Sequence, residues 1–122
     1  MLLKPGIDVV EESFEGGVAV LTIERALLDP DDCPLKCRID HLVQYGNPRI
    51  LIDLFRASLL DSSDIGRLIR AHEAVRRAGG RIHLCNVQPQ VARLLEITRL
   101  DTIFDIHATR DEGIEALQSD GT

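Results

Sequence analysis

The chain has 122 residues, 44% of them hydrophobic and 28% charged, which suits one soluble domain with a buried core. No apolar run approaches the roughly 20 residues of a membrane-spanning helix, and three cysteines are too few for a disulfide framework, so we expect a cytoplasmic protein without a membrane span. The net charge of −6 argues against a nucleic-acid partner, and all of the excess acid lies in residues 1–32.

The start of the chain predicts a hairpin followed by a helix. Residues 7–10 and 18–23 are typical of short strands, and Gly16 with Gly17 between them indicates a tight turn. An aspartate-rich loop over 28–32 then leads into a predicted helix over 35–43, because its apolar residues recur three or four positions apart.

The middle of the chain predicts two buried strands around a helix. Residues 50–54 form a short apolar run, which is typical of a strand buried on both faces. Residues 61–64 (Asp-Ser-Ser-Asp) are the densest cluster of helix-starting residues, and residues 65–75 continue it as one apolar helical face. A further strand is predicted over 81–87.

The end of the chain repeats this alternation. Pro89 is suited to the first position of a third helix, and residues 103–107 and 111–117 predict a last strand and a last helix. The order β-β-α-β-α-β-α-β-α predicts an α/β fold in a single domain over residues 1–122. We expect a mixed, mostly parallel sheet of four to five strands with about four helices packed against it.

A serine pair lies at the predicted junction of a strand and a helix. A helix N-terminus carries roughly half a positive charge together with free N–H groups, so it favours a phosphate. Ser62 or Ser63 is therefore a candidate phosphate acceptor. The same residue types also cap a helix without any phosphorylation, and the motif alone leaves both interpretations open.

The sequence contains no pattern for enzyme or metal chemistry. It has neither a G-x-S-x-G nucleophile motif nor a glycine-rich nucleotide-binding motif. Cys33, Cys37 and His41 lie four residues apart, but no fourth zinc ligand accompanies them. His83 and His107 belong to different predicted strands and have no matching nucleophile. We therefore expect no catalytic residue, no metal and no cofactor.

The stretch from Ile50 to Leu117 resembles the STAS domain, a family named for sulphate transporters and anti-sigma factor antagonists. The family's signature of strand, loop and helix is matched by Asp53-Leu54, Leu60-Asp61-Ser62-Ser63 and Ile65-Gly66. Further matching segments follow in the family's order: Ala78–Arg81, Asn86–Val91, Leu94–Thr98, Leu100-Asp101 and Ile103-Phe104. Leu28-Asp29 fits a weaker family position. The resemblance implies a STAS-like fold.

The resemblance also implies a regulatory role in transcription. In anti-sigma factor antagonists of this family, the partner is an anti-sigma factor that is also a serine kinase, and it phosphorylates the first serine after the aspartate, which here is Ser62. The unphosphorylated antagonist binds the anti-sigma factor and frees the sigma factor, whereas the phosphorylated form lets go. The kinase supplies the ATP site, so the resemblance implies a signalling phosphoprotein that acts by protein–protein interaction and is not an enzyme. The implied partner-binding residues are Asp29, Asp61, Ser62, Ser63, Asp64, Ile65 and Gly66.

A second function class stays open beside this one. The chain could serve as a STAS scaffold or as a subunit of a transport assembly, without a phosphorylation cycle. A homodimer is also a candidate assembly.

The chain departs from the family pattern at four places. Asp64 follows the serine pair where family members usually have glycine, and Arg99 stands where a glycine commonly ends a helix. Residues 24–27 replace a glycine-bearing turn, and Phe55-Arg56 is bulkier than the small residues common there; these two departures bear on partner choice. A carboxylate at Asp64 would repel a phosphate on Ser62 unless an arginine, such as Arg56, neutralises it. On the sequence alone, this repulsion favours the function class without phosphorylation.

Overall fold

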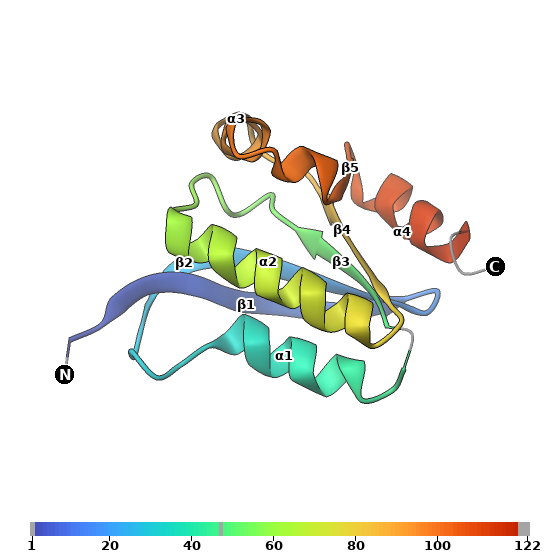
Figure 1. Ribbon diagram of the computed structural model, residues 1–122, viewed down its shortest axis with the longest axis horizontal. Helices are drawn as coiled ribbons and strands as arrows, with labels where there is room; N and C mark the ends of the chain where they lie inside the picture. Colours follow the sequence, from blue (N-terminus) through green and yellow to red (C-terminus); the bar gives the residue numbers. More distant parts are fainter. Residues whose placement is uncertain (1, 47, 120–122) are drawn as a thin grey trace.

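Five strands form one mixed sheet (Figure 1) in the computed structural model, which describes residues 2–46 and 48–119. The strands are β1 (Lys4–Glu15), β2 (Val18–Leu28), β3 (Arg49–Asp53), β4 (Arg81–Cys85) and β5 (Asp105–His107). They lie in the sheet in their order along the chain. β1 and β2 are antiparallel, and every other pair of neighbours is parallel. The predicted mixed, mostly parallel sheet with an antiparallel edge is confirmed.

Four α-helices pack against this sheet. They are α1 (Pro34–Val43), α2 (Ser62–Arg77), α3 (Pro89–Ile97) and α4 (Arg110–Ser119), and a short 3-10 turn, η1 (Leu100–Thr102), precedes β5. In Figure 1, α1 and α2 lie side by side over one face of the sheet. None of the helices built from the described residues combines the length and the apolar character that crossing a bilayer requires.

Side chains of the central strand β3 alternate between two cores. Ile50 and Ile52 are fully buried in the larger core with residues of α1 and α2. Leu51, between them, is fully buried in a smaller core with Leu117 of α4. Because successive side chains of a strand point to opposite faces, α4 covers the face opposite α1 and α2. The prediction that residues 50–54 are buried on both faces is confirmed.

The hairpin is longer than the sequence pattern predicts. The predicted strands over 7–10 and 18–23 extend to β1 and β2, which pair from Lys4 with Leu28 to Glu15 with Val18. The outer residues of this pairing are partly exposed, so they need not be apolar and give a weak hydrophobic signal. As a result β2 reaches Leu28, and its end lies close to the start of α2.

The last strand is shorter than predicted. The predicted strand over 103–107 begins only at Asp105, because residues 103 and 104 belong to a turn. In this turn, Phe104 N donates to Leu100 O at 3.0 Å. Arg99, just before η1, has a left-handed backbone with φ of 64°, where the family pattern usually places glycine. Phe104 is only 2% exposed and fills the larger core, so packing decides this local structure.

Candidate functional site

The loop from β3 to α2 is anchored to the core at three positions. Leu54, Ala57 and Leu60 are buried, at 0%, 1% and 4% exposure respectively. Phe55 and Leu59 between them are exposed, at 48% and 53%. The loop therefore presents two large apolar side chains to solvent while its backbone is held against the larger core.

Helix α2 begins with a reciprocal capping box. Asp61 is the N-cap residue, and its Oδ1 accepts a hydrogen bond from Asp64 N at 2.9 Å. In return, Asp61 N donates to Asp64 Oδ2 at 3.0 Å. This arrangement satisfies N–H groups that a helix start otherwise leaves without partners. It explains why a cluster of aspartates and serines fixes the first turn of α2 at Ser62.

The two serines lie in the exposed first turn. Ser62 and Ser63 are the first residues of α2, and both are exposed to solvent. The capping side chains come from Asp61 and Asp64, so neither serine hydroxyl is needed for the cap. A serine hydroxyl at this position is open to an approaching kinase and lies at the positive end of the helix dipole.

Asp64 is buried and paired with arginines. Its side chain has 0% exposure, and Arg25 Nε lies 3.0 Å from Oδ2 as an ion pair. Arg25 Nη2 also donates to Asp61 Oδ2 at 2.9 Å, so one guanidinium from β2 bridges both carboxylates of the capping box. Arg67 Nη1 donates to Asp64 Oδ1 at 3.3 Å from the next turn of α2. The negative charge of Asp64 is therefore paired with two arginine side chains.

Asp64 is neutralised by an arginine other than Arg56, which the sequence suggested as one candidate for this role. Arg56 Nε instead lies 3.6 Å from Glu24 Oε2, and its guanidinium is 5.9 Å from the centre of the Phe55 ring. Arg25 takes the expected role because β2 is long enough to bring it beside the start of α2. The repulsion expected between Asp64 and a phosphate on Ser62 is correspondingly reduced, since Asp64 is already paired.

The two carboxyls of the capping box have opposite pKa shifts. Burial raises the pKa of Asp64 above its ordinary value, and the Asp61 N–H and the two arginines offset only part of this effect. The hydrogen bond from Asp64 N, with the nearby Arg25 charge, lowers the pKa of Asp61. Of these two carboxyls, Asp64 therefore has the higher pKa and is protonated first on acidification.

The remaining predicted partner-binding residues differ in accessibility. Asp29 is exposed, in the loop between β2 and α1. Ile65 is 7% exposed and belongs to the larger core, and Asp64 is also buried. Neither of these two side chains is therefore presented to a partner. Gly66 is partly exposed. Leu59 is not among the residues predicted from the sequence, and Phe55 is noted there only as a bulky residue that bears on partner choice. A large apolar residue in a loop beside a serine pair is a usable signal for both.

Gly66 lies inside α2 with room for a side chain. A Cβ added there would have Arg70 Nη1 as its nearest neighbour, at 3.5 Å, an ordinary contact. We expect Gly66→Ala to stabilise the protein by about 0.5–1 kcal/mol, because alanine loses less backbone entropy in a helix. Urea denaturation measures this gain. As a control, Gly113→Ala should destabilise, since its Cβ would lie 2.6 Å from Leu51 Cδ1. A loss of stability in Gly66→Ala would contradict the expectation.

Groups considered for metal or catalytic chemistry are placed as follows. Cys33 precedes α1 as its N-cap residue, outside the helix that carries Cys37 and His41. Among residues 2–46 and 48–119, no three His, Cys, Asp or Glu side chains are grouped to hold a metal ion. His83 and His107, separate in the sequence, are brought together by β4 and β5, with His83 Nδ1 3.0 Å from His107 Nε2.

A family model matches this arrangement of sheet and helices over most of the chain. The family model for the STAS domain matches residues 11–113. The chain belongs to the STAS domain family.

Individual relatives agree with this assignment. The chain is 25% identical over 109 residues to the anti-sigma F factor antagonist of Paenibacillus polymyxa, covering 88% of this chain and 91% of that one. It is 33% identical over 58 residues to the anti-sigma-B factor antagonist of Bacillus subtilis, covering 48% and 53%. The crystal structure of an anti-sigma factor antagonist from Mycobacterium paratuberculosis superimposes with a TM-score of 0.73 at 24% identity, over 92% of this chain and 94% of that one. All three are named as antagonists of anti-sigma factors.

Proposed function

We propose that this protein is a cytoplasmic anti-sigma factor antagonist that binds a kinase-type anti-sigma factor and is released by phosphorylation of Ser62. The single observation that carries the proposal is the exposed Ser62 hydroxyl at a helix start whose buried acid is already neutralised. The family membership and the named relatives support the role in general.

The binding surface in this proposal is centred on the first turn of α2. Ser62, Ser63 and the half-exposed Asp61 supply polar groups, and Phe55 with Leu59 supplies apolar area. Apolar and aromatic side chains surrounded by polar groups are typical of protein–protein contacts. Asp29 lies in the neighbouring loop and would contribute at the margin of this surface.

Phosphorylation would alter this surface without unfolding it. The γ-phosphoryl group of the partner's ATP would pass to Ser62 Oγ, with ADP and the hydroxyl proton as the other products. The new group carries roughly −1.5 to −2 charge. The helix dipole and Arg25 favour this charge in the free protein, whereas burial beneath an apolar partner surface disfavours it. The partner is therefore released.

The decisive experiment labels the protein with phosphate, using the anti-sigma kinase recovered from the source cytosol by pull-down. Ser62→Ala should abolish labelling and keep binding to the kinase, whereas Ser63→Ala should still be labelled. The phosphorylated wild-type protein should bind at least about tenfold more weakly than the unphosphorylated protein, a change of about 1.4 kcal/mol.

Two results would contradict the proposal. Persistent labelling of Ser62→Ala would assign the phosphate to another residue. Equal binding of the phosphorylated and unphosphorylated proteins would favour a scaffold or transport-assembly role over a phosphorylation switch.

A further inference from the structure

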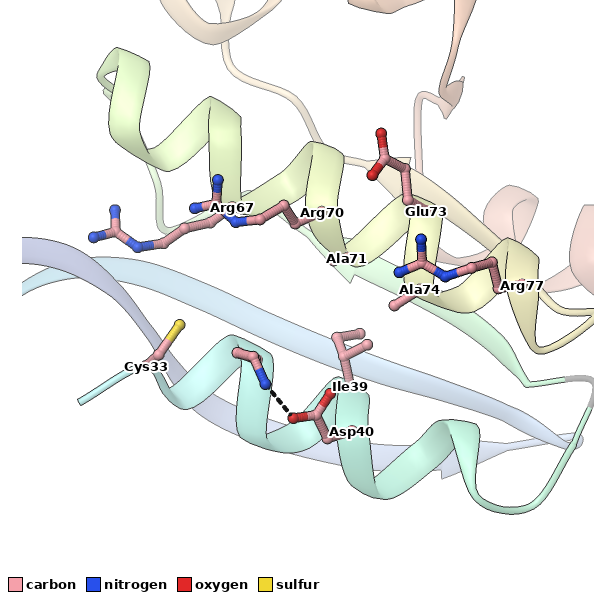
Figure 2. Close-up of a pocket in the computed structure, with 10 residues that line it drawn as sticks. Cys33, Ile39, Asp40, Arg67, Arg70, Ala71, Glu73, Ala74 and Arg77 are labelled. Atoms are coloured by element: carbon pink, nitrogen blue, oxygen red, sulfur yellow. Dashed lines mark hydrogen bonds and ion pairs between the residues drawn. The ribbon is translucent and has the colours of Figure 1, made fainter. Parts of the chain in front are cut away.

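A groove of about 350 Å³ lies between α1 and α2 and runs along α2 from Arg67 to Arg77 (Figure 2). This α1–α2 groove is lined by Arg67, Arg70 and Arg77 from α2, by Lys36 from α1, and by an apolar floor that includes Ile39 and Ala74. Its volume is in the range of small-molecule sites, which are commonly about 300–1,000 Å³.

Two arginines of the groove have no partner among the residues that the structure describes. Arg70 and Arg77 form no hydrogen bond or ion pair with any residue in 2–46 or 48–119, whereas Lys36 is held by Asp40 at 2.6 Å. Arg67 has one bond, to Asp64 at 3.3 Å, and keeps its other N–H donors. Two acids, Asp40 and Glu73, also line the groove. Asp40 is paired with Lys36, and Figure 2 shows the Glu73 carboxylate pointing away from α1, so the three arginines leave the groove with an excess of positive charge. Such a concentration of free guanidinium groups is notable in a chain with a net charge of −6.

The spacing of these arginines sets the shape of a matching ligand. Arg70 and Arg77 are seven residues apart, so they lie on the same side of α2 and about 10 Å apart along its axis. Ala74 lies between them, and Ile39 faces it from α1. The groove therefore has a cationic group near each end, and between them lie the apolar Ile39 and Ala74, with Asp40 held by Lys36 beside them.

We propose that the α1–α2 groove binds a small organic molecule that carries a phosphate group at each end of an apolar body. Arginine matches this chemistry because its planar guanidinium donates two parallel hydrogen bonds to a phosphate. One phosphate would bind Arg70 and the free donors of Arg67, and the other would bind Arg77. The apolar body would cover Ile39 and Ala74.

Calorimetric titration of the full chain tests the proposal with three probes: hexanediol bisphosphate with phosphates on its two terminal carbons, hexyl phosphate, and inorganic phosphate. The bisphosphate should bind at least about tenfold more tightly than hexyl phosphate, because it gains a second charge-assisted contact. Hexyl phosphate should in turn bind more tightly than inorganic phosphate. Amide chemical shifts should change at Ile39 and Ala74 when the bisphosphate binds.

Matched variants locate the second phosphate. Arg77→Gln should reduce the affinity for the bisphosphate to that for hexyl phosphate. Arg76→Gln removes the same charge one residue away, from an exposed side chain that does not line the groove, and should leave the difference intact. Equal affinity of the wild-type protein for all three probes would overturn the proposal. Equal losses in Arg76→Gln and Arg77→Gln would also overturn it, because they would indicate attraction by net charge alone. Neither experiment involves Ser62 or the kinase, so its outcome is independent of the proposed function.

Discussion

Asp64→Ala should destabilise the protein by about 3 kcal/mol and lower its Tm by about 10 °C. The substitution removes the carboxylate that accepts from Asp61 N and that pairs with Arg25 and Arg67. Because Asp64 has 0% exposure, water cannot replace these contacts without entering the larger core, and the two arginines lose a shared partner. Urea denaturation and thermal melting measure the loss.

The matched control for this prediction is Asp61→Ala. Asp61 has the same chemistry and the same Arg25 partner, but its side chain is 46% exposed, so solvent compensates for much of the loss. We expect about 1 kcal/mol, the typical cost of removing an N-cap side chain. If the two variants lose equal stability, burial of Asp64 does not contribute to holding the start of α2.

Asp53→Ala should also cost about 3 kcal/mol or more, because breaking a buried charge pair leaves its partners unsatisfied. Asp53 is 1% exposed at the end of β3. Its carboxylate lies 3.0 Å from Arg110 Nη2 of α4, and it accepts from Asn86 Nδ2 at 3.1 Å and from Phe55 N at 3.0 Å. One side chain thus ties the loop before α2 to the residue that follows β4 and to the start of α4. Urea denaturation provides the measurement.

Glu15→Ala is the corresponding control. Glu15 also pairs with Arg110, at 3.5 Å, but its side chain is 43% exposed. Its removal should change the free energy of unfolding by less than about 0.5 kcal/mol, as is usual for surface pairs. A loss as large as that of Asp53→Ala would mean that Arg110, and not the buried carboxylate, dominates this network.

Local sequence patterns account for the order of the elements and for the start of α2. Strand and helix periods differ, and the glycines, prolines and aspartates at their ends are short-range signals. The cap at Asp61 could be predicted because both of its capping hydrogen bonds are made with Asp64, three residues away. The burial of Asp64 could not be predicted in this way, because an acid in the first turn of a helix is usually exposed.

Contacts between distant residues could not be predicted from local patterns. Arg25 and Asp61 are 36 positions apart, and they meet only because β2 continues beyond its apolar run. His83 and His107 meet because β4 and β5 are neighbours, with Asp105 opposite His83. Strand register determines such pairs, and register depends on the packing of the whole sheet.

The bridge from Arg25 to Asp64 joins two features that appear unrelated in the sequence, the residue after the serine pair and the altered turn near the end of β2. An aspartate at position 64 without Arg25 would leave a buried carboxylate with one cation fewer, and an arginine at position 25 beside glycine would lose a partner. Each substitution alone is therefore costly, and the two together are tolerated. Across the family, an acid at position 64 and a cation at position 25 should be gained and lost as a pair, so that lineages with glycine after the serines rarely carry arginine at the facing strand position.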